Sequence, residues 1–575
     1  MKSTTRKMVG LPLKRSAYLQ WLVSTVLLVG VCALSWAQET DERPGAWRVT
    51  PRISVGATYS DNINLAPADA AQDDYVLQVD PGISVRKRGG RLDLRLDYTA
   101  QGLMYANNSD ANTINNFLQA FGTAELVQQN LFLDVYGSIE QVPIDSSDRT
   151  DVGGLRARGG TPAGLDLFNN IDFGLPGAAD LFGPVGIFSD IALTDNQAAA
   201  HRFGASPYWR QNIGGWAEAL LRYRYDNIFY DEEDRSDDPQ VDPPTSLSDS
   251  QIHTVEVGLA SGRRSTLLEW SIDYFYQRQD DQQDESSLED SDDRRENVIG
   301  QLTYRLNRHW SLLAEAGYEN NRVTDFEENP NGAFWGLGAI WSPNAFFELR
   351  GLYGPEVNEL AVRWNPSVRT LLEVSRRDQE VGVDPGVRWA GTFNHRTRRT
   401  TWFASYTDEV TNNQQLFGSG LLGVGPDGQP LPLDEQGQAV IADGLFGSSN
   451  QNFRRKRFDA GMTYRRGPAG VWVSVFNEDR ENQDSVSDES NYGASTLWTW
   501  RLTPRTASFL GVGWGHDDLS EDRQNDYWVS AIGLARIFTR NSGGLISYRY
   551  YQNDAESAEQ DFRENRLNVR YSMKF

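Results

Sequence analysis

Apolar and polar residues alternate with a period of two at many places along the chain. The pattern is clearest in RLDLRLDYTA (91–100), WAEALLRYRYDNIFY (216–230), LLEWSIDYFY (267–276), ISYRYYQ (546–552) and RLNVRYSMKF (566–575). Successive side chains of a β-strand point to opposite faces, so each segment predicts a strand with one apolar and one polar face. Such strands occur in soluble sheets, where the apolar face is the core, and in membrane barrels, where it contacts lipid.

The lengths of the connections separate these two folds. Tight segments such as KRGG (87–90) and RRGPAG (465–470) alternate with longer polar segments such as residues 231–249, 280–293 and 517–525. Tight periplasmic turns alternating with long extracellular loops are typical of outer-membrane barrels. The sequence therefore predicts an all-β fold: a transmembrane, antiparallel, up-and-down β-barrel of about 24 strands, with short periplasmic turns and long extracellular loops.

The strand number depends on the two longest connections, residues 142–197 and 412–451, which are rich in Gly, Leu and Asp. Counts of 22 and 26 stay open, because strand ends are weakly marked and either segment has room for a further hairpin. One of the two segments could fold into the barrel as a plug. An ordinary surface loop is the simpler expectation for both.

The N-terminus predicts the compartment. Five basic residues precede an apolar run from about Tyr18 to Leu34, and Ser35-Trp36-Ala37 follows. This is typical of a signal peptide that is cleaved after Ala37; the alternative is an uncleaved membrane anchor. We expect a signal peptide at 1–37, a short periplasmic tail at 38–46 and a barrel at 47–575, located in the cell outer membrane of a Gram-negative bacterium.

Composition agrees with this class of protein. The single cysteine, Cys32, lies in the predicted signal peptide, so no disulfide is expected in the mature chain. The mature chain has 50 basic and 79 acidic residues, a net charge of −29, which excludes nucleic-acid binding by general electrostatics. Beyond the signal there is no run of about 18 apolar residues, as a transmembrane helix requires. The many aromatic and glycine residues suit a transmembrane barrel.

Three segments carry a resemblance to a known family: WRVTPRISVGATYSDNINLAP (47–67), YVLQVDPGISVRKRGGRLDLRLDYTAQGLMY (75–105) and SPYW (206–209). They are similar to the outer-membrane β-barrel family associated with PEP-CTERM/exosortase exopolysaccharide systems, and to the broader β-barrel porin type. The resemblance implies an outer-membrane location and a part in exopolysaccharide export or surface assembly. It supplies no catalytic residue that can be carried over.

The polar faces of the predicted strands are the candidate functional surface. They are expected to line the lumen with Arg91, Asp93, Arg95, Asp97, Glu218, Arg222, Arg224, Asp226, Glu269, Asp273, Glu348, Arg350, Arg549, Arg566 and Arg570. One interpretation is cross-strand ion pairing that stabilises the wall; the other is a wetted conduit for a polar solute, and the two are compatible. On the lipid side, Tyr571, Met573 and the terminal Phe575 resemble the signature by which outer-membrane proteins are recognised for assembly, and we expect them to serve that role.

Catalytic, metal and cofactor sites are not expected. No GxSxG or HExxH motif occurs, and the five histidines are placed in turns or near the rim, where His516 precedes two aspartates. The leading hypothesis is a conduit or accessory for passage of a polar solute, exopolysaccharide. The alternative is a structural or adhesive barrel whose acidic loops, DEEDRSDD (231–238) and DDQQDESSLEDSDD (280–293), bind polysaccharide or divalent cations. Expected partners are outer-membrane lipid and lipopolysaccharide, the assembly machinery and exopolysaccharide.

Overall fold

The computed structural model describes the strands and most of the shorter connections. The described residues are 47–142, 175, 178, 181, 191, 198–231, 249–282, 291–323, 330–383, 385–412, 415, 452–482, 488–520, 523–556 and 561–575. The predicted signal peptide (1–37) and tail (38–46) lie outside them. No helix among the described residues is long and apolar enough to cross a membrane.

Twenty-four antiparallel strands form one sheet, and each strand pairs with its neighbour in sequence. The strands are β1 (Trp47–Ser60), β2 (Asp74–Lys87), β3 (Leu92–Tyr105), β4 (Thr113–Val127), β5 (Leu131–Val142), β6 (Ala198–Ile213), β7 (Ala217–Asp231), β8 (Asp249–Ser261), β9 (Leu268–Gln282), β10 (Ser291–Arg305), β11 (Trp310–Glu319), β12 (Gly332–Asn344), β13 (Phe347–Tyr353), β14 (Val357–Ser367), β15 (Thr370–Gln379), β16 (Gly386–Arg396), β17 (Thr400–Thr411), β18 (Phe453–Arg466), β19 (Ala469–Glu481), β20 (Glu489–Thr503), β21 (Thr506–Ser520), β22 (Arg523–Thr539), β23 (Ser542–Ala555) and β24 (Phe562–Lys574). A short 3₁₀ helix, η1 (Ser109–Ala111), follows β3.

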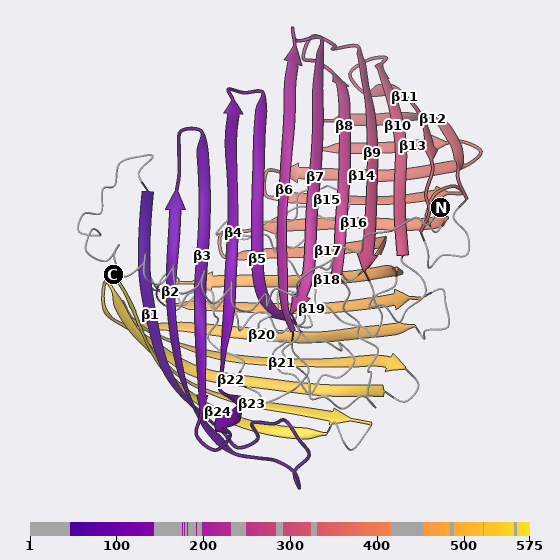
Figure 1. Cartoon of the computed structure of the whole chain (residues 1–575). Coiled ribbons are helices and arrows are strands. Elements are labelled where there is room, and N and C mark those ends of the chain that lie inside the picture. Colours follow the sequence, from indigo (N-terminus) through magenta and orange to yellow (C-terminus); the bar gives the residue numbers. More distant parts are fainter. Residues whose placement is uncertain are drawn as a thin grey trace, which may run out of the picture.

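The sheet closes because β1 pairs with β24, from Arg52 opposite Lys574 to Ser60 opposite Arg566. In Figure 1, β1–β9 run crosswise to β14–β24, as expected when the tilted strands of two facing walls are seen together. The predicted all-β, antiparallel, up-and-down barrel of 24 strands is therefore confirmed. The terminal residue takes part in the closure, since the Phe575 N–H donates to the Pro51 carbonyl at 2.9 Å.

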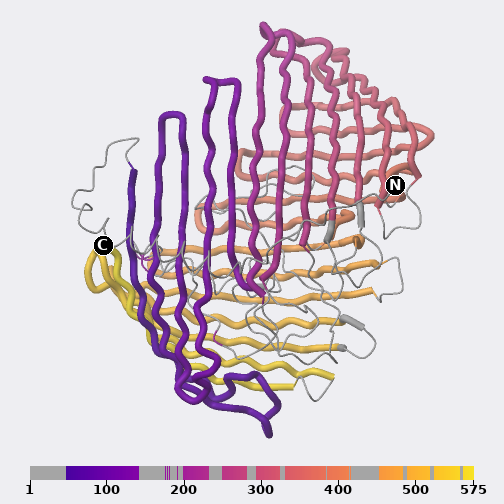
Figure 2. The backbone as a smooth tube through the Cα atoms, in the orientation of Figure 1, coloured from indigo at the N-terminus to yellow at the C-terminus, as the bar shows by residue number. Residues whose placement is uncertain are grey.

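The two ends of the barrel differ. At one end, here called the turn end, connections of a few residues join β2 with β3, β4 with β5 and every second pair that follows (Figure 2). Gly89 and Gly90, in the predicted KRGG turn, have φ of 113° and 71°, a region that L side chains rarely adopt. The other end, the loop end, carries the longer connections, with short exceptions between β13 and β14, where a short connection was expected at 354–357, and between β21 and β22. The rhythm of turns and loops predicted from the sequence is thus present.

Some polar segments predicted to be loops are strands. β21 continues to Ser520 and β22 begins at Arg523, so most of the expected loop 517–525 is paired. Likewise β9 and β10 extend into the expected loop 280–293, to Gln282 and from Ser291. The predicted strands ended where the apolar alternation ended. At the loop end the backbone ladder continues beyond that point, although both faces are polar there.

Candidate functional site on the inner face

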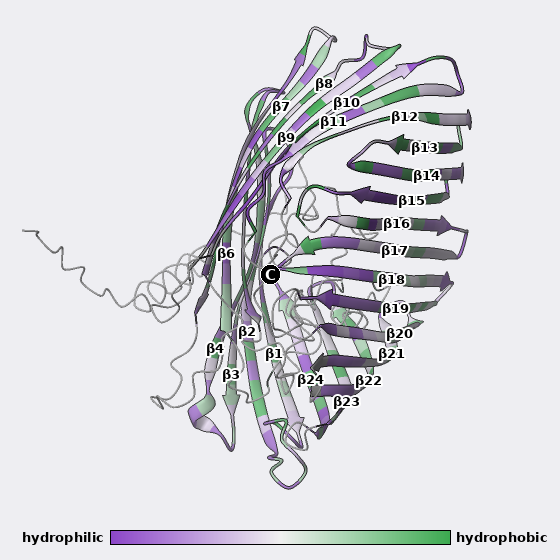
Figure 3. Cartoon of the chain, turned by 90° about the vertical axis from the view of Figure 1, so that its right-hand side faces the viewer, coloured by the Kyte–Doolittle hydropathy of each residue, from purple (hydrophilic) through white to green (hydrophobic). Residues whose placement is uncertain are grey.

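Each strand has one face toward the enclosed space and one away from it. On β24, Leu567, Val569 and Tyr571 are 45–49% exposed, whereas the alternating Arg566, Asn568 and Arg570 are only 3–5% exposed. Figure 3 shows the same alternation as apolar and polar bands along the strands. The apolar face is therefore the outer face, and the polar face is the inner face.

The outer face carries aromatic residues at two levels. On β11, the exposed Trp310 and Tyr318 are separated by eight residues, about 26 Å at the rise of a β-strand. Exposed rings near the turn end are Trp47, Trp209, Trp216, Trp341, Trp364, Trp500, Phe538 and Phe575. Exposed rings nearer the loop end are Tyr75, Trp335, Tyr353, Tyr492 and Trp528. Two aromatic girdles that flank an apolar band are the lipid-contacting surface of membrane barrels.

The fifteen residues expected to line the lumen lie on inner faces. They do not form one cluster, because they are spread over six strands around the wall or at the ends of those strands. Most form local ion pairs: Arg95 with Asp97 at 3.1 Å, Arg350 with Glu315 and Glu359 at 3.1 and 2.9 Å, and Glu269 with Arg305 at 2.9 Å. Cross-strand pairing is therefore present. Their role in lining a path for a solute stays a prediction, as does the assembly role of Tyr571, Met573 and Phe575, which lie on the outer face.

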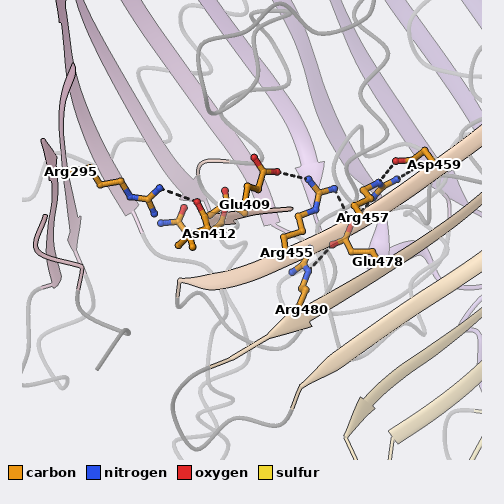
Figure 4. A network of polar contacts seen from close by, with 10 residues as sticks. Arg295, Glu409, Asn412, Arg455, Arg457, Asp459, Glu478 and Arg480 are labelled. Carbon is orange, nitrogen blue, oxygen red and sulfur yellow. Dashed lines mark hydrogen bonds and ion pairs between the residues drawn. The ribbon is translucent and has the colours of Figure 1, made fainter. Parts of the chain in front are cut away.

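A buried charge cluster around Glu478 was not singled out from the sequence. Glu478 of β19 is 1% exposed and accepts hydrogen bonds from Arg455, Arg457 and Arg480 at 2.9, 2.6 and 2.8 Å (Figure 4). Arg455 also pairs with Glu409, and Arg457 with Asp459. In FRRKRF (453–458) basic residues occupy both faces, so no amphipathic pattern distinguishes the inner arginines.

A polar contact joins two distant parts of the wall at the loop end. Arg295 of β10 donates to the Val410 carbonyl at 3.0 Å and to Asn452 Oδ1 at 3.3 Å, and Asn452 in turn bonds Asp293. Asn412 donates to Gln279 Oε1 at 3.3 Å. In the wall, β9–β10 and β17–β18 are separated by β11–β16, which have only 7 to 13 residues. We call this contact the loop-end bridge: Gln279, Asp293, Arg295, Val410, Asn412 and Asn452.

The loop end is also filled beside β20–β24. Leu65, Leu175 and Leu181 are buried in one apolar cluster with inner side chains of these strands, including Phe509, Val529 and Phe562. Ile191 is buried against β2 and β3, and its carbonyl accepts a hydrogen bond from the Tyr105 hydroxyl at 3.2 Å. The described residues of 142–197 therefore lie inward, whereas a surface loop was the simpler expectation. The remaining residues of that segment lie outside the described ones.

Inner charges near the turn end are, in contrast, accessible to solvent. Arg95 and Arg86 are 49% and 48% exposed, and Arg363 and Glu373 are 59% and 44% exposed. Inner charges nearer the loop end, such as Glu478 and Glu564, are buried. Inner charges are thus accessible to solvent near the turn end, and the inner charges named nearer the loop end are buried by neighbouring side chains.

The histidines do not gather on the inner face. His253 contacts the Tyr223 hydroxyl at 2.8 Å, and His201 stacks on Phe229 with ring centroids 4.7 Å apart. His516 contacts Asp526 Oδ1 at 3.1 Å; its sequence neighbour Asp517 points to the inner face instead. Among the described residues, no group of three or more His, Cys, Asp or Glu side chains could hold a metal ion.

A closed antiparallel barrel with two aromatic girdles outside and a polar wall inside is the architecture of bacterial outer-membrane proteins. The protein is a 24-stranded outer-membrane β-barrel, in the location predicted from the sequence. No family model matches the chain, and no curated protein gives a significant match.

Solved structures similar to the chain include the open form of the ferric-catecholate import receptor Fiu from E. coli K12. The identity is 9% and the TM-score 0.45, over 93% of this chain and 82% of that chain. The siderophore receptor PirA from Pseudomonas aeruginosa is similar with 9% identity and a TM-score of 0.40, over 93% of this chain and 81% of that chain. At this identity and TM-score, the likeness supports no inference about ligand or function.

Proposed function

We propose that the barrel is a conduit, or an accessory of one, for passage of a polar solute across the outer membrane, and that the solute is exopolysaccharide. The observation that carries the proposal is the polar inner face, whose charges near the turn end are about half exposed. A barrel of 24 strands is too wide for wall side chains alone to fill, so its interior holds water or inserted chain. The resemblance of residues 47–67 and 75–105 to exopolysaccharide-associated barrels supports the choice of solute.

The loop-end bridge is the barrier that such a conduit must open. We expect the protein to conduct ions in planar bilayers, and we expect Arg295→Ala to raise the conductance, because it removes the bonds to Val410 and Asn452. Arg363→Ala is the matched control. It also removes an inner arginine, but this arginine pairs with Glu373 near the turn end, and neither residue belongs to the loop-end bridge. Bilayers that stay closed for both the native protein and Arg295→Ala at all voltages would contradict the conduit.

The apolar cluster and the loop-end bridge at the loop end favour a second candidate, a structural or adhesive barrel through which no solute passes. In that case deletion of 232–248 and 283–290, the parts of the acidic loops outside the strands, abolishes retention of polymer at the cell surface, while conductance is absent before and after the deletion. Conductance by the native protein, with polymer retention unchanged by the deletions, would eliminate this candidate.

A further inference from the structure

Like charges lie directly opposite one another on the inner face of five consecutive strands, β23, β24, β1, β2 and β3. In the register of the sheet, Arg86 lies opposite Arg48 of β1 on one side and opposite Arg95 of β3 on the other. Arg549 of β23 likewise lies opposite Arg566 of β24. Like charges directly opposite one another destabilise a sheet, so these rows lower the stability of the folded barrel. We call the following residues the basic ladder: Arg48, Arg52, Arg86, Arg95, Arg549, Arg566, Arg570 and Lys574.

The described carboxylates on these strands are fewer than the basic residues of the ladder. Asp97 pairs with Arg95 at 3.1 Å and with Arg86 at 3.9 Å, Glu564 pairs with Arg549 at 2.6 Å and with Arg566 at 2.7 Å, and Asp80 pairs with Arg570 at 2.5 Å. Among the described inner-face residues of the five strands, eight basic residues therefore meet five acidic ones. The acidic residues are Asp74, Asp80, Asp93, Asp97 and Glu564. The wall carries a net charge of +3 within a chain whose net charge is −24.

Another part of the wall shows that this excess is not a requirement of the fold. On β13, β14 and β15 the row nearest the turn end reads Glu348, Arg363, Glu373, so opposite charges lie opposite one another. Arg363 and Glu373 are 3.0 Å apart there. The inner face of this barrel can thus carry charged side chains whose charges balance, and the basic ladder departs from that arrangement.

The basic ladder runs from the turn end of the barrel toward the loop end. Arg86 and Arg95 are about half exposed near the turn end, whereas Arg549 and Arg566, beyond them along the wall, are 2–3% exposed. Between these levels, Arg52 lies across Gly82, where a Cβ would stand 2.7 Å from its Nε. Arg52 donates to the Thr99 hydroxyl at 2.6 Å and to the Ser84 hydroxyl at 3.4 Å. Hydroxyl groups therefore position this guanidinium, and the Ser84 hydroxyl in turn donates to Asp97 at 2.5 Å.

We propose that the turn-end part of the basic ladder, Arg52, Arg86 and Arg95, binds the carboxylate groups of an acidic polysaccharide that enters from the turn end. This inference rests on the proposed function and specifies its substrate class. The planar guanidinium group matches a carboxylate with two parallel hydrogen bonds, and such charge-assisted bonds are the strong ones. A row of guanidiniums on neighbouring strands suits a polymer with repeated carboxylates, whereas a neutral glycan offers Arg86 and Arg95 no opposite charge.

The test is calorimetric titration of the full barrel in detergent with oligogalacturonate, and with a neutral malto-oligosaccharide of the same length. We expect the native protein to bind only the acidic oligomer, more weakly as salt is added. Replacing Arg52, Arg86 and Arg95 together by Gln should weaken binding by about tenfold or more, since one charge-assisted hydrogen bond is worth roughly a power of ten in affinity. Arg363→Gln removes the same kind of charge elsewhere and should leave binding unchanged.

Equal binding of both oligomers, or equal binding by the triple variant and the native protein, would overturn the inference. If the triple variant does not fold, Arg86→Gln and Arg95→Gln, at half-exposed positions, are tested singly. Binding without conductance would refute the conduit and leave the ladder standing. Conductance without binding of the acidic oligomer would refute the ladder and leave the conduit standing.

Discussion

The Glu478 cluster allows a sharp test of what stabilises the barrel. Replacing Glu478 by Gln keeps the shape of the side chain but leaves Arg455, Arg457 and Arg480, all within 2.9 Å of the carboxylate, without their shared charge. Because the carboxylate is 1% exposed, water cannot substitute for it. Removing one partner of a buried ion pair costs about 3–5 kcal/mol, so we expect a loss of that size in the free energy of unfolding.

The assay is urea unfolding of the protein in lipid vesicles, followed by the fluorescence of its tryptophans, 15 of which lie beyond the predicted signal peptide. Glu373→Gln is the matched control, because Glu373 pairs with Arg363 at 3.0 Å on the same kind of inner face but is 44% exposed. An exposed pair is worth about 1 kcal/mol or less. The reasoning is refuted if the two variants lose the same stability. A double variant, Glu478→Gln with Arg480→Gln, should cost less than the two single losses combined.

Two further predictions concern folding. Phe575→Asp or deletion of Phe575 should lower the amount of folded protein in the outer membrane, measured by heat-dependent migration on gels; unchanged amounts would remove the assembly role of this residue. Gly204→Ala should destabilise the protein by about 1–3 kcal/mol, because the added Cβ would stand 2.2 Å from the Tyr136 ring, which bonds Asp226 at 2.6 Å. Gly351→Ala, with no atom within 4 Å of its Cβ, should be nearly neutral, and equal losses for the two would contradict this account.

The barrel could be predicted from the sequence because its main signal is local. Each hairpin shows its alternation and its turn within about 30 residues, and closure follows once the number of strands is large and even. The inner residues on β3, β7 and β24 were found in the same way, since their opposite faces are apolar. The method fails where both faces are polar, as in FRRKRF (453–458), and Arg455 and Arg457 were missed for that reason.

Long-range contacts had no such signal. The loop-end bridge joins Asp293 and Arg295 to Asn452, and Gln279 to Asn412, more than a hundred residues away, and no local pattern marks those positions. The inward position of Leu175 and Leu181 depends on the apolar inner surface of β20–β24, which is visible only once the strands are assembled. Rows of like charge such as Arg48, Arg86 and Arg95 likewise appear only when the register is known.

The unequal length of the strands has a consequence outside the membrane. A membrane-spanning strand needs about 9–11 residues, which β11, β14, β15 and β16 match with 10 or 11. The strands β6–β10 have 13 to 16 residues, so part of each lies beyond the bilayer. Beside β13, which has seven residues, the wall is lower at the loop end, because β12 continues there from Leu337 to Gly332 without a partner in β13. The rim of the barrel is therefore uneven, and a large molecule at the cell surface meets the wall of β6–β10 before it meets the low side at β13.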